Sequence, residues 1–106
     1  MFFAVIAWDK PDSTAVRAAT KLRHKEHLDA GAPQLRVLQS GPLLSPEGVQ
    51  VGSLVVIEAE TAGAVEAFMS RDPYVRAGLF SSFEARPWLW RRGNPYLSPF
   101  QGFQTS

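Results

Sequence analysis

The segment from Phe2 to Trp8 constrains the fold most, because all seven of its residues are apolar. A run of aromatic and branched residues that ends at Asp9 and Lys10 predicts a buried β-strand followed by a loop. Side chains alternate between the two faces of a strand. One face would carry Phe2, Ala4, Ile6 and Trp8, and the other Phe3, Val5 and Ala7. Both faces of the sheet therefore need to be covered at this strand.

Turn-forming residues divide the following chain into further elements. Ser13 is a suitable N-cap and Gly31 ends the pattern, so residues 14–30 are predicted to form a helix. We expect strands over 34–44, 49–60 and 80–90, and a second helix over 62–70. The order βαββαβ predicts a ferredoxin-like α+β sandwich, a four-stranded antiparallel sheet with helices on one face. The other face would stay bare in one chain, so we expect a homodimer closed by the sheet faces.

Length and composition exclude several classes of protein. A chain of 106 residues is predicted to form one domain, and its net charge of +1 does not favour nucleic-acid binding. The absence of cysteine excludes disulfides, thiol nucleophiles and zinc–thiolate sites. No apolar run approaches the roughly 20 residues that cross a bilayer. We therefore expect a cytoplasmic protein with neither a nucleic acid nor a membrane as its partner.

The two histidines, His24 and His27, are spaced three apart on the first predicted helix, where they would be surface neighbours. The apolar stripe of this helix is formed by Ala15, Ala18, Ala19 and Leu22. His27 would lie at the edge of this stripe beside Val16, and His24 would lie further toward solvent. His27 is then either a hydrogen-bonded boundary residue or a catalytic acid-base group. A metal site is a third interpretation, but no further histidine completes a ligand set, so we expect none.

Asp72 has an equally simple structural interpretation. Asp followed by Pro is a good N-cap and N1 pair, so Asp72 is predicted to begin a short helix. If Asp72 also meets His27, its carboxylate would fix the imidazole tautomer and leave the other ring nitrogen free to move a proton. One role does not exclude the other.

Several segments together carry a family resemblance. They are Phe2 to Trp8, His27-Leu28, Ser40 to Leu43, Gly52 to Glu58 and, above all, Asp72-Pro73-Tyr74-Val75-Arg76-Ala77-Gly78-Leu79. In this order they resemble the YCII-related (YciI-like) proteins. The resemblance implies a dimeric α+β barrel, in which two ferredoxin-like sheets pack face to face. It implies a YCII-related domain over residues 1–90, followed by an irregular aromatic arm over 91–106 that lies beyond the usual family end.

The same resemblance implies site residues. A histidine on the first helix and the aspartate of the Asp-Pro-Tyr motif are proposed as a catalytic dyad in the family, which gives His27 and Asp72 here. Tyr74, Arg76 and His24 become candidate substrate-binding residues, with His24 standing where the family often has an arginine. The clearest family activity is dehydrochlorination of a chlorinated hydroxyhydroquinone, and no cofactor is implied.

Two functions of different classes stay open. The first is a small cofactor-independent enzyme of lyase, dehydrochlorinase or isomerase type, with His27 as acid-base group. The second is a non-catalytic module of the same fold that binds a small molecule or has a regulatory role. The distance between His27 and Asp72 would discriminate between them. We also expect the arm over 91–106 to be ordered by contact with the partner subunit.

Overall fold

The computed structural model describes residues 1–96 and shows the predicted element order. The strands are β1 (Phe2–Asp9), β2 (Arg36–Leu44), β3 (Gln50–Glu58) and β4 (Phe80–Trp88), and the helices are α1 (Thr14–Ala30), α2 (Ala62–Ser70) and α3 (Pro73–Arg76). Local chemistry explains the helix starts: the Thr61 hydroxyl accepts from the Ala64 N–H at α2, and Asp72 caps α3 ahead of Pro73.

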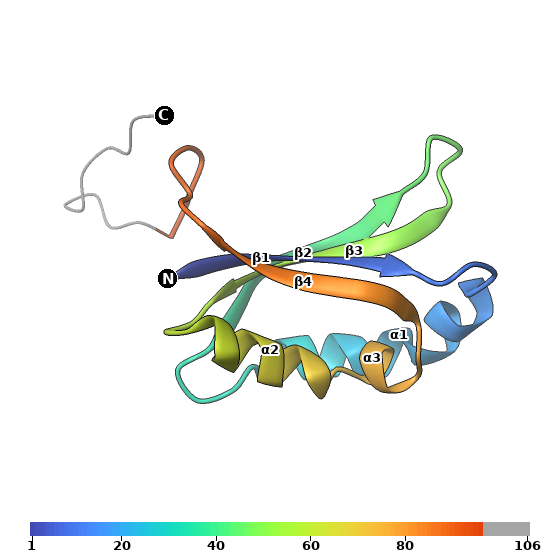
Figure 1. Cartoon of the computed structure of the whole chain (residues 1–106), viewed down its shortest axis with the longest axis horizontal. Helices are drawn as coiled ribbons and strands as arrows, with labels where there is room; N and C mark the ends of the chain where they lie inside the picture. The colour runs from blue at the N-terminus through green and yellow to red at the C-terminus, as the bar shows by residue number, and fades with distance from the viewer. Residues whose placement is uncertain (97–106) are drawn as a thin grey trace.

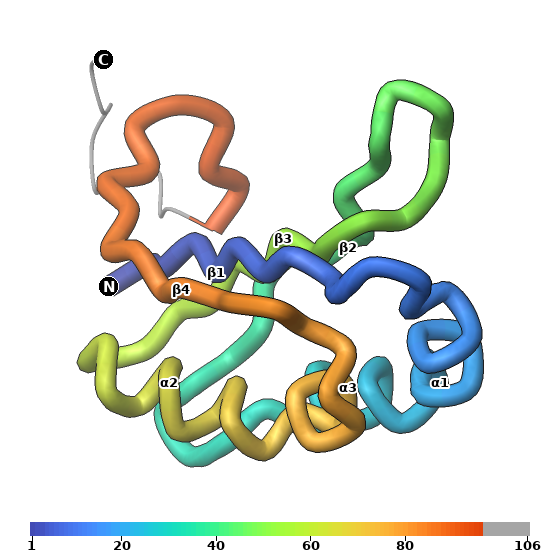
Figure 2. The backbone as a smooth tube through the Cα atoms, turned by 45° about the vertical axis from the view of Figure 1, so that its right-hand side comes forward, coloured from blue at the N-terminus to red at the C-terminus, as the bar shows by residue number. Residues whose placement is uncertain are grey.

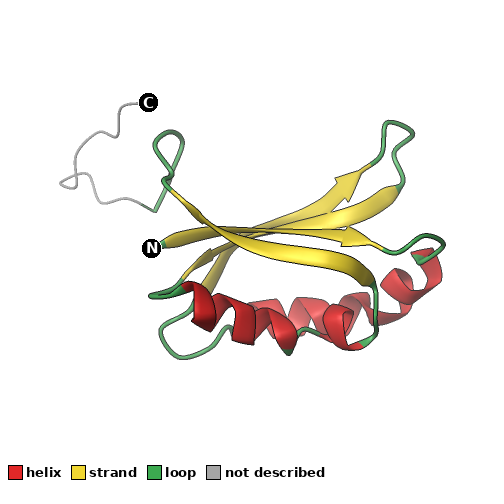
Figure 3. Cartoon of the chain, viewed as in Figure 1, coloured by secondary structure: helices red, strands yellow, loops and turns green. Residues whose placement is uncertain are grey.

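The strands form one antiparallel sheet in the order β2-β3-β1-β4. The apolar strand β1 is central, with Val5 opposite Val55 on one side and Ala85 on the other. Pro87 lies in the edge strand β4, where its missing N–H costs no ladder hydrogen bond on the outer side. All helices cover one face of the sheet (Figures 1 and 3). This is the predicted ferredoxin-like α+β sandwich.

The core lies between the sheet and the helices. Strands β1 and β3 contribute Phe3, Val5, Val55 and Ile57, and α2 contributes Val65, Phe68 and Met69. Removing these large side chains from water supplies the main favourable term of folding. No helix within residues 1–96 is long and apolar enough to span a bilayer.

Helix α1 does not bury the predicted stripe. Ala15, Ala18 and Ala19 are exposed, and the Leu22 side chain is 67% exposed. The buried residues of α1 are Arg17, Thr20 and Leu28 instead. The stripe prediction is wrong because three of its members are alanines, which offer little apolar area. The opposite face carries Arg17, whose Nε and Nη2 donate to acceptors inside the fold.

Two segments rise from the sheet face that the helices leave open, namely the β2–β3 hairpin and the chain after β4 (Figure 2). The Trp90 ring packs edge-on against Phe2, and its side chain is 6% exposed. The Tyr96 hydroxyl donates to the Leu38 carbonyl oxygen at 2.8 Å. The described part of the predicted arm thus contacts its own sheet, and the rest of the arm, 97–106, lies outside the described residues.

Candidate active site

Asp72 and His24 form a hydrogen-bonded pair between α3 and α1. The Asp72 side chain is completely buried, and both of its carboxylate oxygens lie within 2.8–2.9 Å of His24 Nδ1. Oδ1 also accepts from the Tyr74 N–H at 2.9 Å, which is the N-cap bond of α3. A carboxylate can only accept, so Nδ1 carries the proton and Nε2 is left as the basic ring nitrogen. Asp72 therefore combines the two roles considered from the sequence.

The predicted pairing of His27 with Asp72 is wrong, because Asp72 pairs with His24 instead. His27 Nε2 donates to the Phe68 carbonyl oxygen at 2.9 Å, and the imidazole stacks on the Phe68 ring with centroids 4.2 Å apart. The three residues between His24 and His27 correspond to about 300° of helix rotation. This rotation is enough to direct His24 toward α3 and His27 toward α2. His27 is thus the hydrogen-bonded boundary residue of the alternative interpretation.

Tyr74 supports the His24 ring. The two rings stack with centroids 3.9 Å apart and planes 16° from parallel. The Arg17 guanidinium carbon lies 4.9 Å from the centre of the Tyr74 ring. Tyr74 is buried and lines the same cavity as His24, and its role in substrate binding stays a prediction.

Arg17 anchors this cluster to the sheet, and sequence reasoning missed it. Its Nε and Nη2 donate to the two carboxylate oxygens of Asp9, each at 2.8 Å. Nη2 also donates to the Gly52 carbonyl oxygen and to Ser53 Oγ, both at 2.9 Å. A Cβ at Gly52 would collide with the Ala7 carbonyl oxygen, so only glycine fits this strand position.

Burial and nearby charges shift the pKa values of Tyr74 and Arg17. Burial raises the pKa of the Tyr74 phenol above its ordinary 10.0, although the nearby Arg17 cation opposes that rise. Burial disfavours the charged form of Arg17, but the hydrogen bonds and charge of Asp9 outweigh this effect and raise the Arg17 pKa. Tyr74 is therefore neutral and Arg17 charged at neutral pH.

His24 and Tyr74 line a cavity of about 360 Å³ between α1, α3 and strands β2 and β3. Helix α1 contributes Arg17, Lys21, His24, Lys25, Leu28 and Asp29, and the strands contribute Ser40 to Pro42, Gln50 and Ser53 to Val55. Arg76 was also a candidate substrate-binding residue, but it is exposed and does not line this cavity. The spacing Arg17, Lys21, His24, Leu28 follows one helix face and is the sequence signal that could have identified the site.

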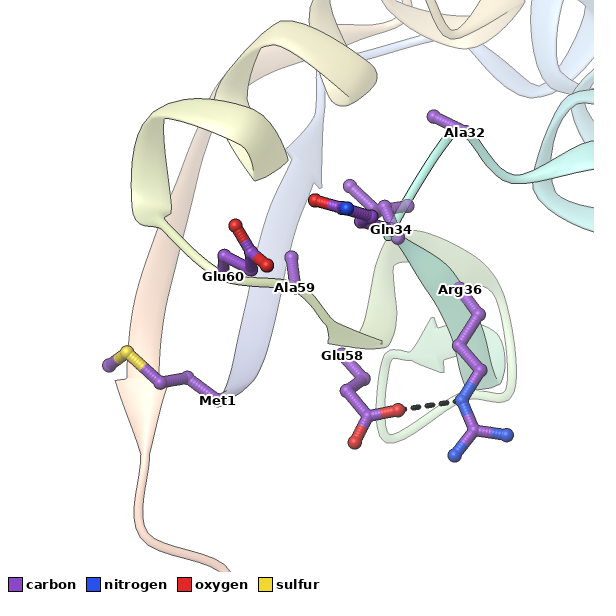
Figure 4. Close-up of a pocket in the computed structure, with 8 residues that line it drawn as sticks. Met1, Ala32, Gln34, Arg36, Glu58, Ala59 and Glu60 are labelled. Atoms are coloured by element: carbon purple, nitrogen blue, oxygen red, sulfur yellow. Dashed lines mark hydrogen bonds and ion pairs between the residues drawn. The ribbon is translucent and has the colours of Figure 1, made fainter.

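A second hollow lies at the other end of the sheet, between the start of β2 and the end of β3 (Figure 4). Its charged groups are Arg36, Glu58 and Glu60, and the ion pair between Arg36 Nε and Glu58 Oε1 is solvent-exposed. None of the residues that line this hollow is a buried titratable group. Across residues 1–96 no group of three His, Asp or Glu side chains is placed to hold a metal ion. The cavity at His24 is therefore the candidate site.

Comparison with known proteins agrees with this fold. The model of the YCII-related domain matches residues 1–89. Protein YciI of Escherichia coli is 29% identical over 93 residues, which cover 82% of this chain and 95% of YciI. An uncharacterized protein of Haemophilus influenzae is 27% identical over a stretch of the same length, with the same coverage.

Two solved structures are also similar. The 5-chloro-2-hydroxyhydroquinone dehydrochlorinase TftG from Burkholderia phenoliruptrix, in complex with 2,5-dihydroxybenzoquinone, superposes with a TM-score of 0.73 at 28% identity. The alignment covers 83% of this chain and 93% of TftG. A putative antibiotic biosynthesis monooxygenase from Nitrosomonas europaea shares the fold, with a TM-score of 0.51 at 17% identity over 87% of this chain and 92% of its own. These neighbours are dimeric α+β barrel proteins.

Proposed function

Because the chain belongs to the YCII-related family, we propose that it is a small enzyme that moves protons on a small organic molecule. His24 is the general acid-base residue and Asp72 is the residue that positions it. One observation carries the proposal: the fully buried Asp72 carboxylate holds Nδ1 of a histidine whose ring lines a cavity. Burying a carboxylate is costly, and here two donors match it, the His24 Nδ1–H shared between both oxygens and the Tyr74 N–H. The first of these contacts also orients the imidazole.

In this proposal each group has a step. Nε2 of His24 has no protein partner within residues 1–96, so its lone pair is available to a bound molecule. It takes a proton from a C–H or O–H group of the substrate, and the Asp72 charge stabilises the imidazolium that forms. The electron pair of the broken bond then forms a C=C or C=O bond. On a chlorinated hydroquinone, the proton taken from one hydroxyl is returned to the chlorine-bearing ring carbon, and loss of a second hydroxyl proton with departure of chloride leaves the quinone, which is a lyase reaction. Return of the proton to another carbon of a substrate gives an isomerisation.

The similarity to TftG supports this chemistry, since that protein is a dehydrochlorinase with a small oxygen-rich ring compound bound. We also propose that the chain is a homodimer closed by the open sheet faces. Trp8, Leu54 and Trp88 on that face are exposed in the single chain, and the structural neighbours are dimeric α+β barrel proteins.

The test measures chloride release from 5-chloro-2-hydroxyhydroquinone by the wild type, by His24→Asn and by the matched control His27→Gln. His27 occupies the same helix but donates to the Phe68 carbonyl, so the control perturbs a histidine outside the cavity. We expect His24→Asn to lose about 10²-fold or more in rate and His27→Gln to keep most of it.

Equal rates for the wild type and His24→Asn would contradict the proposed acid-base role. Binding of the hydroquinone without turnover by the wild type would favour the alternative function, a small-molecule-binding or regulatory module.

A further inference from the structure

The charges around the His24 cavity do not balance. Asp29 is the only acidic side chain among its lining residues, and its Oδ2 is already paired with Lys25 Nζ at 2.7 Å. His24 is matched by Asp72 and Arg17 by Asp9. Lys21 lines the same cavity and has neither an ion-pair nor a hydrogen-bond partner within residues 1–96. One positive charge is therefore left for whatever occupies the cavity.

One uncharged polar group at the cavity wall, the Ser53 hydroxyl, is also available as a donor. Ser53 is buried at the cavity wall, and its Oγ accepts from Arg17 Nη2 at 2.9 Å. Arg17 uses one acceptor site of that hydroxyl, and the Ser53 O–H donates to no acceptor within residues 1–96. A donor that is buried and unmatched is costly unless the ligand accepts from it.

Part of the remaining wall is apolar and the space is small. Leu28, Val55 and the Tyr74 ring line the cavity beside these donors. A volume of about 360 Å³ is near the lower end for small-molecule sites, which range from roughly 300 to 1,000 Å³. The cavity therefore suits a compact molecule with an apolar body.

We propose that the ligand of this cavity is a small organic anion, with a single carboxylate or oxyanion bound by Lys21 and the Ser53 hydroxyl and an apolar body against Leu28 and Val55. This inference rests on the proposed function, since it names the substrate class of the same site. Lys21 and His24 are three residues apart on α1 and hence neighbours on its surface. An anion held at Lys21 places the adjoining carbon next to His24 Nε2, and the ammonium group stabilises negative charge that develops when that carbon loses its proton.

The experiment compares benzoate with benzamide, which has the same ring and nearly the same shape but no charge. Binding to the full-length protein is followed by NMR titration of backbone amides around the cavity. We expect benzoate to bind at least tenfold more tightly than benzamide, because a hydrogen bond to a charged group contributes about tenfold or more. Lys21→Gln should remove about that factor, and Lys21→Arg should restore most of it.

Arg23→Gln is the matched control, since Arg23 is an exposed cation on the same helix that does not line the cavity. It should change benzoate binding less than threefold. Equal binding of the two probes, no binding of either, or equal losses in Lys21→Gln and Arg23→Gln would each overturn the inference. These outcomes concern binding alone, so they are distinct from the test of the proposed chemistry. If benzoate binding depends on Lys21 but no chloride is released, the proposed chemistry is rejected and the proposed ligand class is kept.

Discussion

The Asp72 carboxylate accepts hydrogen bonds from two groups, the Tyr74 N–H at the start of α3 and the His24 imidazole on α1. Asparagine has one carbonyl oxygen that can still cap Tyr74, but it carries no charge to stabilise an imidazolium. We expect Asp72→Asn to keep the stability of the fold within about 1 kcal/mol, since N-caps of Asp and Asn are nearly equivalent. Turnover should fall by about 10²- to 10⁴-fold.

Urea unfolding and the chloride-release rate measure the two effects separately. Asp72→Ala is the comparison, because it removes the cap as well and should cost a further 0.5–2 kcal/mol or so. A fully active Asp72→Asn variant would show that the carboxylate is only a cap.

The raised pKa of Tyr74 predicts that the stability of the fold depends on pH in the alkaline range. Its pKa is raised in the folded protein by burial, so the folded state holds the phenolic proton more tightly than the unfolded state does. The stabilisation is complete below the ordinary pKa of 10.0 and is lost as the pH rises through that value toward the raised one. Urea midpoints between pH 8 and 11 should fall more steeply for the wild type than for Tyr74→Phe. Parallel curves for the two proteins would exclude this contribution.

At the scale of elements, one ion pair joins α1 to the sheet. Arg17 on α1 meets Asp9 at the end of β1 and the Gly52 carbonyl on β3, and both charged side chains are buried. Removing one partner leaves the other charge buried without a counter-ion, which typically costs about 3–5 kcal/mol. We expect Arg17→Gln to lose that much stability in urea unfolding.

The double variant Asp9→Asn with Arg17→Gln is the control for this pair, because it leaves no isolated charge. It should be more stable than Arg17→Gln alone, so the double-mutant cycle should show strong coupling. Additive losses would mean that Arg17 stabilises the fold through packing rather than through its charge.

At the scale of the whole molecule, the proposed homodimer depends on the open sheet face. Leu54 lies on that face opposite Ile6 and is 37% exposed, whereas Leu22 is exposed on α1 in the helix layer. We expect the wild type to scatter light as a dimer and Leu54→Lys to shift it toward monomer or aggregate. Leu22→Lys, the same substitution in the other layer, should remain dimeric. A monomeric wild type at micromolar concentration would contradict the sheet-face dimer.

The sequence by itself determined the secondary structure and the layer arrangement. The bounds 14–30 predicted for the first helix agree with Thr14–Ala30, and the apolar strand predicted at 2–8 is the central β1. These features follow from local signals, namely caps, turns and side-chain periodicity, which act within a few residues. Asp72 was identified in the same way, from the residues that surround it.

Only the tertiary structure decided which face of α1 is buried and which histidine meets Asp72. Periodicity shows which residues share a helix face, but the burial of a face depends on the groups that it meets. Arg17 is buried because Asp9, Gly52 and Ser53 supply its acceptors from two strands, and Asp72 reaches His24 across 48 residues of chain. An alanine stripe has too little apolar area to outweigh those contacts. The polar face therefore turned inward and brought His24, not His27, to the cavity.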